Sequence, residues 1–241
     1  MKFPDIEYFN QFKNLRTPFY YNIATNTTPK ISIIITTRIG ERPIFTLNSL
    51  KKLDLQQIEI IIEHDYKGKD FSRTKNRGAK RAKGEILIFM DDDIAFDKDF
   101  FYKFIQAIEP KTLVGLSYKP TLNWIIARVI GIKRDDFWYL GGFFDPMSYM
   151  CEDIELAIRA QYFGFKLNKF PVESVVHLDT PTYKRLFVRN LHNNWNGIFV
   201  SLRYHNVPIC NWFKRKNPFH LCFRLIALIY WGLYLKIIDK R

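Results

Sequence analysis

The chain has 241 residues, of which 47% are hydrophobic and 17% aromatic, and this composition excludes a disordered protein. The length suits one sizeable α/β domain with an appendage rather than two full domains. A formal net charge of +13 favours polyanionic partners, namely nucleotides, nucleic acid or an anionic membrane surface, without choosing among them. The three cysteines form no Cys-x-x-Cys pair, so neither a disulfide framework nor a thiolate zinc site is indicated, and a reducing, cytoplasmic setting is expected.

The N-terminal half reads as alternating strands and helices. Residues 1–29 are polar and aromatic, lack the apolar run of a secretory signal and predict a lead-in to the domain. Strands are predicted over residues 31–36, 58–62 and 85–90, and helices over residues 43–53 and 72–83. This β-α-β-α-β order predicts a parallel sheet of Rossmann type. The chain has no Gly-x-Gly-x-x-Gly or Walker loop, which disfavours dinucleotide cofactors and P-loop chemistry.

The middle of the chain carries weaker signals. A helix is predicted over residues 99–108, a strand over 113–118 and a tight turn at Gly141-Gly142. An amphipathic helix then runs from the acidic residues 151–155 to Gly164, and residues 172–177 predict another strand.

Three consecutive aspartates, Asp91, Asp92 and Asp93, directly follow the apolar run of residues 86–90. Like carboxylates in such proximity stay ionised near neutral pH only when a metal or basic groups neutralise them. Ligands of open α/β sheets bind beyond the carboxyl ends of the strands, where hard oxygens suit Mg²⁺ or Mn²⁺ carrying substrate phosphates. The alternative is a loop or helix start that favours Asp for conformational reasons.

The C-terminal third has a different character. Residues 183–203 alternate basic and aromatic side chains, and residues 219–238 are strongly apolar. Arg224 and Lys236 bracket an uncharged core of only 11 residues, which predicts a helix lying in a membrane interface rather than spanning the bilayer. The flanking basic residues 214–216 and 240–241 would meet anionic headgroups. The alternatives are a buried core helix and a dimer contact.

An ordered set of motifs resembles the inverting glycosyltransferases of the GT-A fold, family 2, over roughly residues 30–205. Residues 32–38 look like the first strand and its nucleotide-contacting turn, and residues 59–65 look like the second strand, with His64 in place of the first of two aspartates. The remaining matches are Asn76-x-Gly78, Ala82-x-Gly84-Glu85, Asp91-x-Asp93, Gly141-Gly142-Phe143, Glu152-Asp153 and Arg189-Asn190.

The resemblance implies an α/β fold, a Rossmann-like α/β/α sandwich with a mostly parallel central sheet and a C-terminal amphipathic helical appendage. The expected parts are a lead-in over residues 1–29, a GT-A catalytic domain over residues 30–205 and an apolar, basic helix over residues 206–241. The implied activity is metal-dependent transfer of a sugar from a UDP or GDP type donor to an acceptor hydroxyl, with inversion. The expected partners are a glycan or lipid-linked acceptor and an anionic surface at the cytosolic membrane face, and no nucleic acid partner is expected. The sequence does not identify the acceptor itself, whether a lipid-linked glycan, a protein or a small molecule.

Site roles follow from the same resemblance. Asp93 would bind Mn²⁺ or Mg²⁺ directly, Asp91 would bind the metal or face the ribose, and His177 matches a third metal ligand of some relatives. Asp65 matches the position that holds the nucleobase. The implied substrate-binding residues are Thr36, Arg38, Asp65, Arg73, Asp91, Asp92, Gly142 and Glu152. Lys75 and Arg77 are expected near the pyrophosphate, although most basic residues of this helix are expected to face solvent.

Asp153 is the expected general base, which would draw the proton from the acceptor hydroxyl in the transition state. The alternative role is local, because Asp and Glu are favoured at helix N-termini. The helix dipole lowers the pKa of such a group, whereas burial or a neighbouring Glu152 or Glu155 raises it.

Two other functions fit parts of the pattern. A nucleotidyltransferase also holds metal and phosphates with paired aspartates, but its Gly-rich loop has only a thin counterpart in residues 36–40. A non-catalytic basic module that binds nucleic acid or membrane would account for the charge and the aromatic tail.

Overall fold

The structure is a computed structural model that describes residues 20–23, 28–37, 43–66, 70–147, 151–178, 195–200, 202–204 and 226–235. It contains two compact units, one formed by residues 1–148 and 152–179 and the other by residues 149–151 and 180–241. Arg38 and Arg189-Asn190 lie outside the described residues. The domain limits expected after residues 29 and 205 stay predictions.

The first unit is built on a seven-stranded sheet with the order β1-β3-β2-β4-β7-β6-β8. Its strands are β1 Tyr20–Ile23, β2 Ile31–Thr37, β3 Ile58–His64, β4 Ile86–Asp91, β6 Thr112–Ser117, β7 Ile126–Lys133 and β8 Lys166–Pro171. β3, β2 and β4 are parallel, and β7 is antiparallel to both β4 and β6, so β6 and its parallel neighbour β8 run in the same direction as β4. Only β1 and β7 run the other way, which confirms the mostly parallel sheet.

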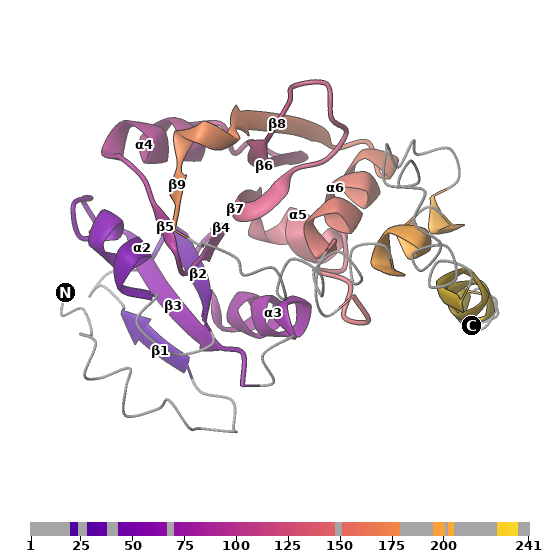
Figure 1. The fold of residues 1–241 in the computed structure, drawn as a ribbon. Coiled ribbons are helices and arrows are strands. Elements are labelled where there is room, and N and C mark those ends of the chain that lie inside the picture. The colour runs from indigo at the N-terminus through magenta and orange to yellow at the C-terminus, as the bar shows by residue number, and fades with distance from the viewer. Residues whose placement is uncertain are drawn as a thin grey trace. The chain divides into compact units, whose positions relative to one another are not determined.

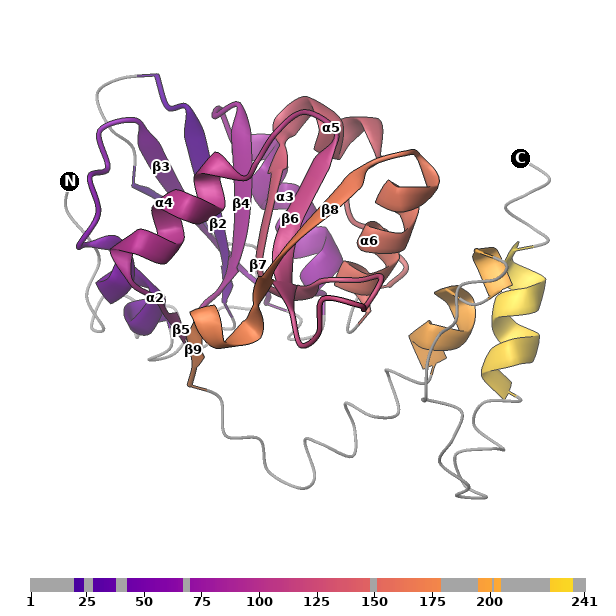
Figure 2. The same ribbon diagram turned by 90° about the horizontal axis from the view of Figure 1, so that it is seen from above.

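Helices cover both faces of this sheet, as Figures 1 and 2 show. They are α2 Pro43–Leu50, α3 Phe71–Arg81, α4 Lys98–Gln106, α5 Arg134–Tyr139 and α6 Glu152–Tyr162. α2 and α4 pack on one face, where their side chains join Ile33 and Ile35 in one core cluster. α3, α5 and α6 pack on the other face, where Ile34 enters the second cluster. Because both faces are covered, the central strands are apolar without alternation, and the α/β/α sandwich is confirmed.

Most predicted elements are present within a few residues of their expected ends, but the segment at residues 172–177 is not the predicted strand. It forms a short 3₁₀ turn, η1 Val172–Ser174, followed by the two-residue strand β9 Val176–His177. Val172 and Val175 are both buried. Side chains three residues apart lie on the same side of a 3₁₀ turn, whereas in an extended strand they would point to opposite faces. β9 pairs with β5, Ile94–Ala95, outside the main sheet.

The second unit packs two described helical segments together, residues 195–200 and 226–235. The indole N–H of Trp231 donates a hydrogen bond of 2.9 Å to the carbonyl of Trp195. The rings of Trp231 and Phe199 lie 4.6 Å apart between centroids. Among the described residues, no helix has both the length and the apolarity needed to cross a bilayer.

Candidate active site

The ends of three parallel strands meet at one edge of the sheet. Thr36, near the end of β2, lies opposite Glu63 in β3 on one side and opposite Asp91, the last residue of β4, on the other. Asp65 follows β3 directly, and its backbone N–H donates to the carbonyl of Thr37 over 2.8 Å. The register therefore gathers the polar residues that end these strands at the carboxyl edge, where open α/β sheets bind ligands.

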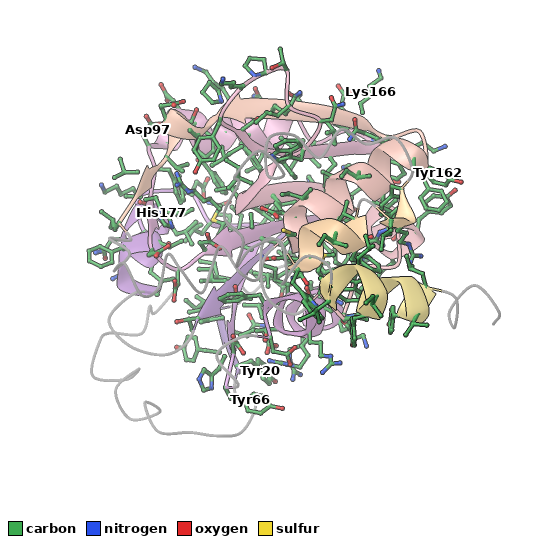
Figure 3. All side chains as sticks on the ribbon, turned by 45° about the vertical axis from the view of Figure 1, so that its right-hand side comes forward. Tyr20, Tyr66, Asp97, Tyr162, Lys166 and His177 are labelled. Atoms are coloured by element: carbon green, nitrogen blue, oxygen red, sulfur yellow. The ribbon has the colours of Figure 1, made fainter. Side chains whose placement is uncertain are left out.

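Asp91, Asp93 and His177 form a group of candidate metal ligands. One ligand atom from each lies within 4.8 Å of the others, and the Nε2 atom of His177 is 3.2 Å from Oδ1 of Asp93. His177 is labelled in Figure 3 and comes from β9, where it lies opposite Ile94 of β5. Two carboxylates and an imidazole fit a divalent cation such as Mn²⁺. Asp92 lies in the same turn but outside this group.

The acidic turn is fixed by α2. The hydroxyl of Thr46 lies 2.8 Å from the carbonyl oxygen of Asp91 and accepts a hydrogen bond of 3.2 Å from the N–H of Ile94. On the other side, the N–H of Leu178 donates to the carbonyl of Asp93 over 2.9 Å. Both flanks of the turn are held, so contacts within the fold fix the backbone that carries these carboxylates.

The electrostatics of this turn call for a cation. The pKa of Asp91 is raised to about 7, chiefly by burial, with Asp93 and Asp92 contributing to the rise and the ammonium of Lys75 and His177 opposing it. A carboxyl group in this state gains a full charge when a divalent ion replaces its proton.

Asp153 lies in the first turn of α6. Its Oδ2 atom accepts a hydrogen bond of 2.7 Å from the N–H of Ala127 in β7, and Oδ1 accepts one of 2.8 Å from the N–H of Ile154. Burial raises the pKa of this carboxyl to about 7 and Glu152 adds to the rise, whereas Lys75 and the two backbone N–H groups oppose it. Burial and Glu152 thus outweigh the local helix contacts that lower the pKa.

The turn at Gly141-Gly142 connects α5 to the segment before α6. Both glycines have positive φ angles, +84° and +74°, as the predicted tight turn requires. Arg159 of α6 donates to the carbonyls of Leu140 and Gly142, the second over 2.7 Å, and its guanidinium is held by Glu155 at 2.7 and 2.9 Å. This buried ion pair fixes α6, and with it Glu152 and Asp153, against the glycine turn.

Asn76 of α3 joins the same turn from the other side. Its Nδ2 donates to the carbonyl of Phe143 over 2.8 Å, and its Oδ1 accepts from the N–H of Phe143 over 2.9 Å. A Cβ atom on Gly142 would approach Oδ1 of Asn76 to 2.8 Å, so the amide fills the place of a side chain there. The matched residues Asn76 and Gly142 therefore act together in holding the turn.

Lys75 is buried, although most basic residues of its helix are expected to face solvent. It is 2% exposed, and its Nζ lies 2.9 Å from Oε1 of Glu152. The rings of Phe71 and Phe143 lie 5.9 and 5.2 Å from the ammonium. A signal for this burial exists in the sequence, because Lys75 shares the helical stripe of Ser72 and Ala79, both small and buried.

Thr36, Asp65 and Arg73, which are also expected to bind the donor, differ in their exposure to solvent. Thr36 and Asp65 are buried, and both carboxylate oxygens of Asp65 accept from the N–H of Asp70, at 3.3 and 3.2 Å. Arg73 is exposed, 4.0 Å from Asp70 and 3.8 Å from Asp145. Their substrate-binding roles, like that of Gly142, stay predictions.

Comparison with known proteins agrees with this fold. Residues 45–123 match the model described as glycosyl transferase family 2. The fold is similar to the mannosyltransferase PcManGT from Pyrobaculum calidifontis in complex with GDP-Man and Mn²⁺, with 15% identity, a TM-score of 0.56, and coverage of 86% of this chain and 76% of that one. It is also similar to GalNAc-T7 with UDP, GalNAc and Mn²⁺, with 11% identity, a TM-score of 0.50, and coverage of 73% of this chain and 48% of that one.

The search of curated proteins gives no match. The resemblance drawn from the motifs is nevertheless confirmed, because residues 45–123 match the glycosyl transferase family 2 model and the fold is similar to that of GT-A glycosyltransferases. The matched segment contains Asp65, Arg73 and the three aspartates, and it ends before Gly142, Glu152, Asp153 and His177.

Proposed function

We propose that this glycosyltransferase moves a sugar from a nucleoside-diphosphate sugar of the UDP or GDP type to an acceptor hydroxyl, in a metal-dependent reaction that inverts the anomeric centre. The observation that carries the proposal is the grouping of Asp91, Asp93 and His177 within 4.8 Å at the carboxyl edge of the sheet. Two structures of similar fold hold Mn²⁺ with GDP-Man or with UDP and GalNAc, which supports this donor class.

On the donor side, Asp91, Asp93 and His177 would hold the divalent ion. When bound, the ion neutralises the diphosphate and stabilises the leaving group as negative charge develops on it. The imidazole favours Mn²⁺ over Mg²⁺, because Mg²⁺ prefers oxygen ligands in near-ideal octahedral geometry. Asp65 and Thr36 would contact the nucleoside from the neighbouring strand ends.

On the acceptor side, Asp153 would accept the proton of the attacking hydroxyl. Burial raises the pKa of this carboxyl to about 7, which places it near the range in which a general base is effective. The hydroxyl oxygen then attacks the anomeric carbon as the bond to the diphosphate breaks, and a single displacement of this kind inverts the configuration.

The test is a screen of UDP- and GDP-sugars with Mn²⁺, in which the released product is identified and the linkage of the transferred sugar is assigned by NMR. Release of nucleoside diphosphate with an inverted linkage is expected. Pyrophosphate release would identify a nucleotidyltransferase, and a retained linkage would refute the single displacement. If Mn²⁺ with UDP or GDP leaves the melting temperature unchanged, the non-catalytic module is favoured instead.

Membrane docking is proposed for the C-terminal helix of residues 226–235. Ile226, Ile229, Tyr230 and Leu233 recur with helical spacing and are 50–64% exposed, whereas Ala227 and Trp231 on the other face are buried. Adjacent exposed apolar side chains on one helix face are typical of a surface that binds a partner or a membrane. The basic residues 214–216 and 240–241 in the flanking sequence favour an anionic lipid surface, which would bring the enzyme to lipid-linked acceptors.

This docking is tested by co-sedimentation with vesicles of anionic and of neutral lipid. The substitution Ile229→Asp with Leu233→Asp is expected to abolish binding to anionic vesicles. Tyr162→Asp, on an exposed tyrosine of the first unit labelled in Figure 3, is the matched control and is expected to bind normally. Unchanged sedimentation of the double variant would refute docking through this face, and loss of a dimer in the same variant would assign the face to a second copy of the chain.

A further inference from the structure

The acid-base roles above leave the buried Lys75 without a function. We propose that Lys75 is a positioning residue on the acceptor side of the site: its ammonium holds Glu152, and thereby keeps the first turn of α6 and the Asp153 carboxylate in place. This inference rests on the proposed function of Asp153 as the base.

The geometry of the ion pair supports this role. Nζ of Lys75 lies 2.9 Å from Oε1 of Glu152, and both side chains are almost completely withdrawn from solvent, at 2% and 6% exposure. Removing one partner of a buried pair leaves an uncompensated charge, so the two groups hold one another firmly. Glu152 is the first residue of α6 and the immediate neighbour of Asp153, and the pair therefore ties the start of α6 to the middle of α3.

The lysine is enclosed rather than presented to a ligand. Its ammonium lies 5.2 Å from the centre of the Phe143 ring and 5.9 Å from that of Phe71. Phe143 belongs to the segment that Asn76, the next residue after Lys75, holds with two hydrogen bonds. The charge is thus fixed in a rigid frame, where it acts on the carboxylates around it.

Those carboxylates include the expected base, Asp153. Burial lowers the pKa of Lys75, but the charges of Glu152, Asp91 and Asp153 outweigh burial and raise it. In return, Lys75 lowers the pKa of Asp153 in α6. The buried cation therefore stabilises the ionised form of the expected base.

Two neighbours shift the pKa of Asp153 in opposite directions, so removing each of them should have an opposite effect. Glu152 on its own helix raises the pKa of Asp153, Lys75 on α3 lowers it, and the N–H groups of Ala127 in β7 and Ile154 also lower it. Removing the charge of Lys75 must move the titration of Asp153 to higher pH, and removing that of Glu152 must move it to lower pH.

The experiment compares Lys75→Met, Lys75→Arg and Glu152→Gln with the wild type. Two readouts are recorded against pH: kcat with donor KM, and the carboxyl carbon NMR signal of Asp153, assigned through its loss in Asp153→Asn. In Lys75→Met, kcat at neutral pH is expected to fall at least about 10-fold, and both titrations are expected to move up by about one pH unit. Glu152→Gln is expected to move both down, and Lys75→Arg to stay near the wild type.

Lys80→Met is the matched control, because Lys80 lies on the same helix and is exposed. Its pH profile is expected to match the wild type. A fall in kcat for Lys75→Met with no movement of either titration would assign Lys75 a merely structural role and overturn the proposal, and a rise in donor KM alone would assign it to donor binding. If Lys75→Met fails to fold, Glu152→Gln decides in the same way. If the wild type transfers no sugar, the proposed function fails, while the NMR titration still judges Lys75.

Discussion

The two edges of the central sheet both bury carboxylates, but they support them in opposite ways. At the amino edge, Glu59 of β3 is buried and accepts hydrogen bonds of 2.6 Å from the hydroxyl of Ser32 and from the N–H of Lys83. The Ser32 hydroxyl in turn accepts from the N–H of Gly84 over 2.8 Å. The donors around this carboxylate are neutral, and their hydrogen bonds hold β2, β3 and the turn before β4 together.

At the carboxyl edge, Asp91 lies close to Asp93, and Asp153 directly follows Glu152 at the start of α6. Burial and the neighbours Asp93 and Asp92 raise the pKa of Asp91 to about 7, and burial with Glu152 does the same for Asp153. Such groups weaken the fold in their ionised form and are stabilised only by a cation or a transferable proton. Burial of a carboxylate is therefore not itself a sign of function. The kind of group that surrounds the carboxylate, neutral donors or other carboxylates, distinguishes a structural site from a functional one.

The largest effect is expected for Asp93→Ala, which removes a candidate metal ligand from the carboxyl edge. Transfer should fall by at least about 1,000-fold, because a missing ligand leaves the diphosphate charge uncompensated. The rise in melting temperature caused by Mn²⁺ with UDP or GDP should disappear. Asp99→Ala, at an exposed position of α4, is the control. A metal-dependent rise that persists in Asp93→Ala would contradict the assignment of the metal site.

Asp153→Asn is expected to reduce kcat at least about 100-fold while nucleotide binding is preserved, because the amide cannot accept the acceptor proton. The base must be ionised to act, so the wild-type kcat should rise with pH through the Asp153 pKa of about 7. Steady-state kinetics across pH and nucleotide titration measure both. Asp135→Asn, at an exposed position, serves as the control. Normal turnover of Asp153→Asn would remove Asp153 from the mechanism.

The amino edge should respond in stability and not in metal binding. In Glu59→Gln a neutral amide oxygen replaces the carboxylate oxygen that accepts from both Ser32 and Lys83, and the new NH₂ group meets the Nδ2 donor of Asn22. The free energy of unfolding should therefore fall by about 2 kcal/mol. Urea denaturation measures the loss, with the exposed Glu109→Gln as control. The Mn²⁺-dependent rise in melting temperature should remain. If it is lost instead, the two edges are coupled and the contrast between them fails.

The smallest effect is expected at Gly142, and Gly164 provides a matched partner. Both have positive φ angles, +74° and +78°, so Ala at either position should lower stability by about 1–2 kcal/mol. Only at Gly142 would the new Cβ meet a neighbour, Oδ1 of Asn76 at 2.8 Å, because Gly164 has nothing within 4 Å. Gly142→Ala should therefore also reduce kcat about 10-fold. Equal turnover of the two variants would show that the glycine turn does not position α6.

Much of the fold can be predicted from the sequence because its central strands are buried on both faces. Ile33, Ile34 and Ile35 are all inaccessible to solvent, and such apolar runs with Gly and Pro between them are readable without tertiary information. β7 is not readable in this way, because Arg128 and Gly131 interrupt its pattern and its antiparallel direction departs from a regular Rossmann order.

The residues of the candidate site can be predicted from the sequence where a motif contains them. They cannot be predicted where only tertiary packing brings them to the site. Asp91 and Asp93 stand out because charge directly follows an apolar strand. Lys75 does not, since a lysine in a basic helix is expected to face solvent. The helical stripe that it shares with the small residues Ser72 and Ala79 is a weak signal, and its charge partner Glu152 is distant in sequence. His177 is marked by the family resemblance, whereas the short β5–β9 pairing that brings it to Asp93 is a contact between distant segments.

That β5–β9 pairing also bears on the order in which the protein matures. Asp91 and Asp93 belong to the early part of the chain, but His177 leaves the ribosome only after β8, the last strand of the main sheet. The first strands and helices can therefore fold during synthesis, before His177 has joined Asp91 and Asp93. Capture of the ion through all three side chains would then be a late event of biosynthesis, sealing a domain whose core is already formed.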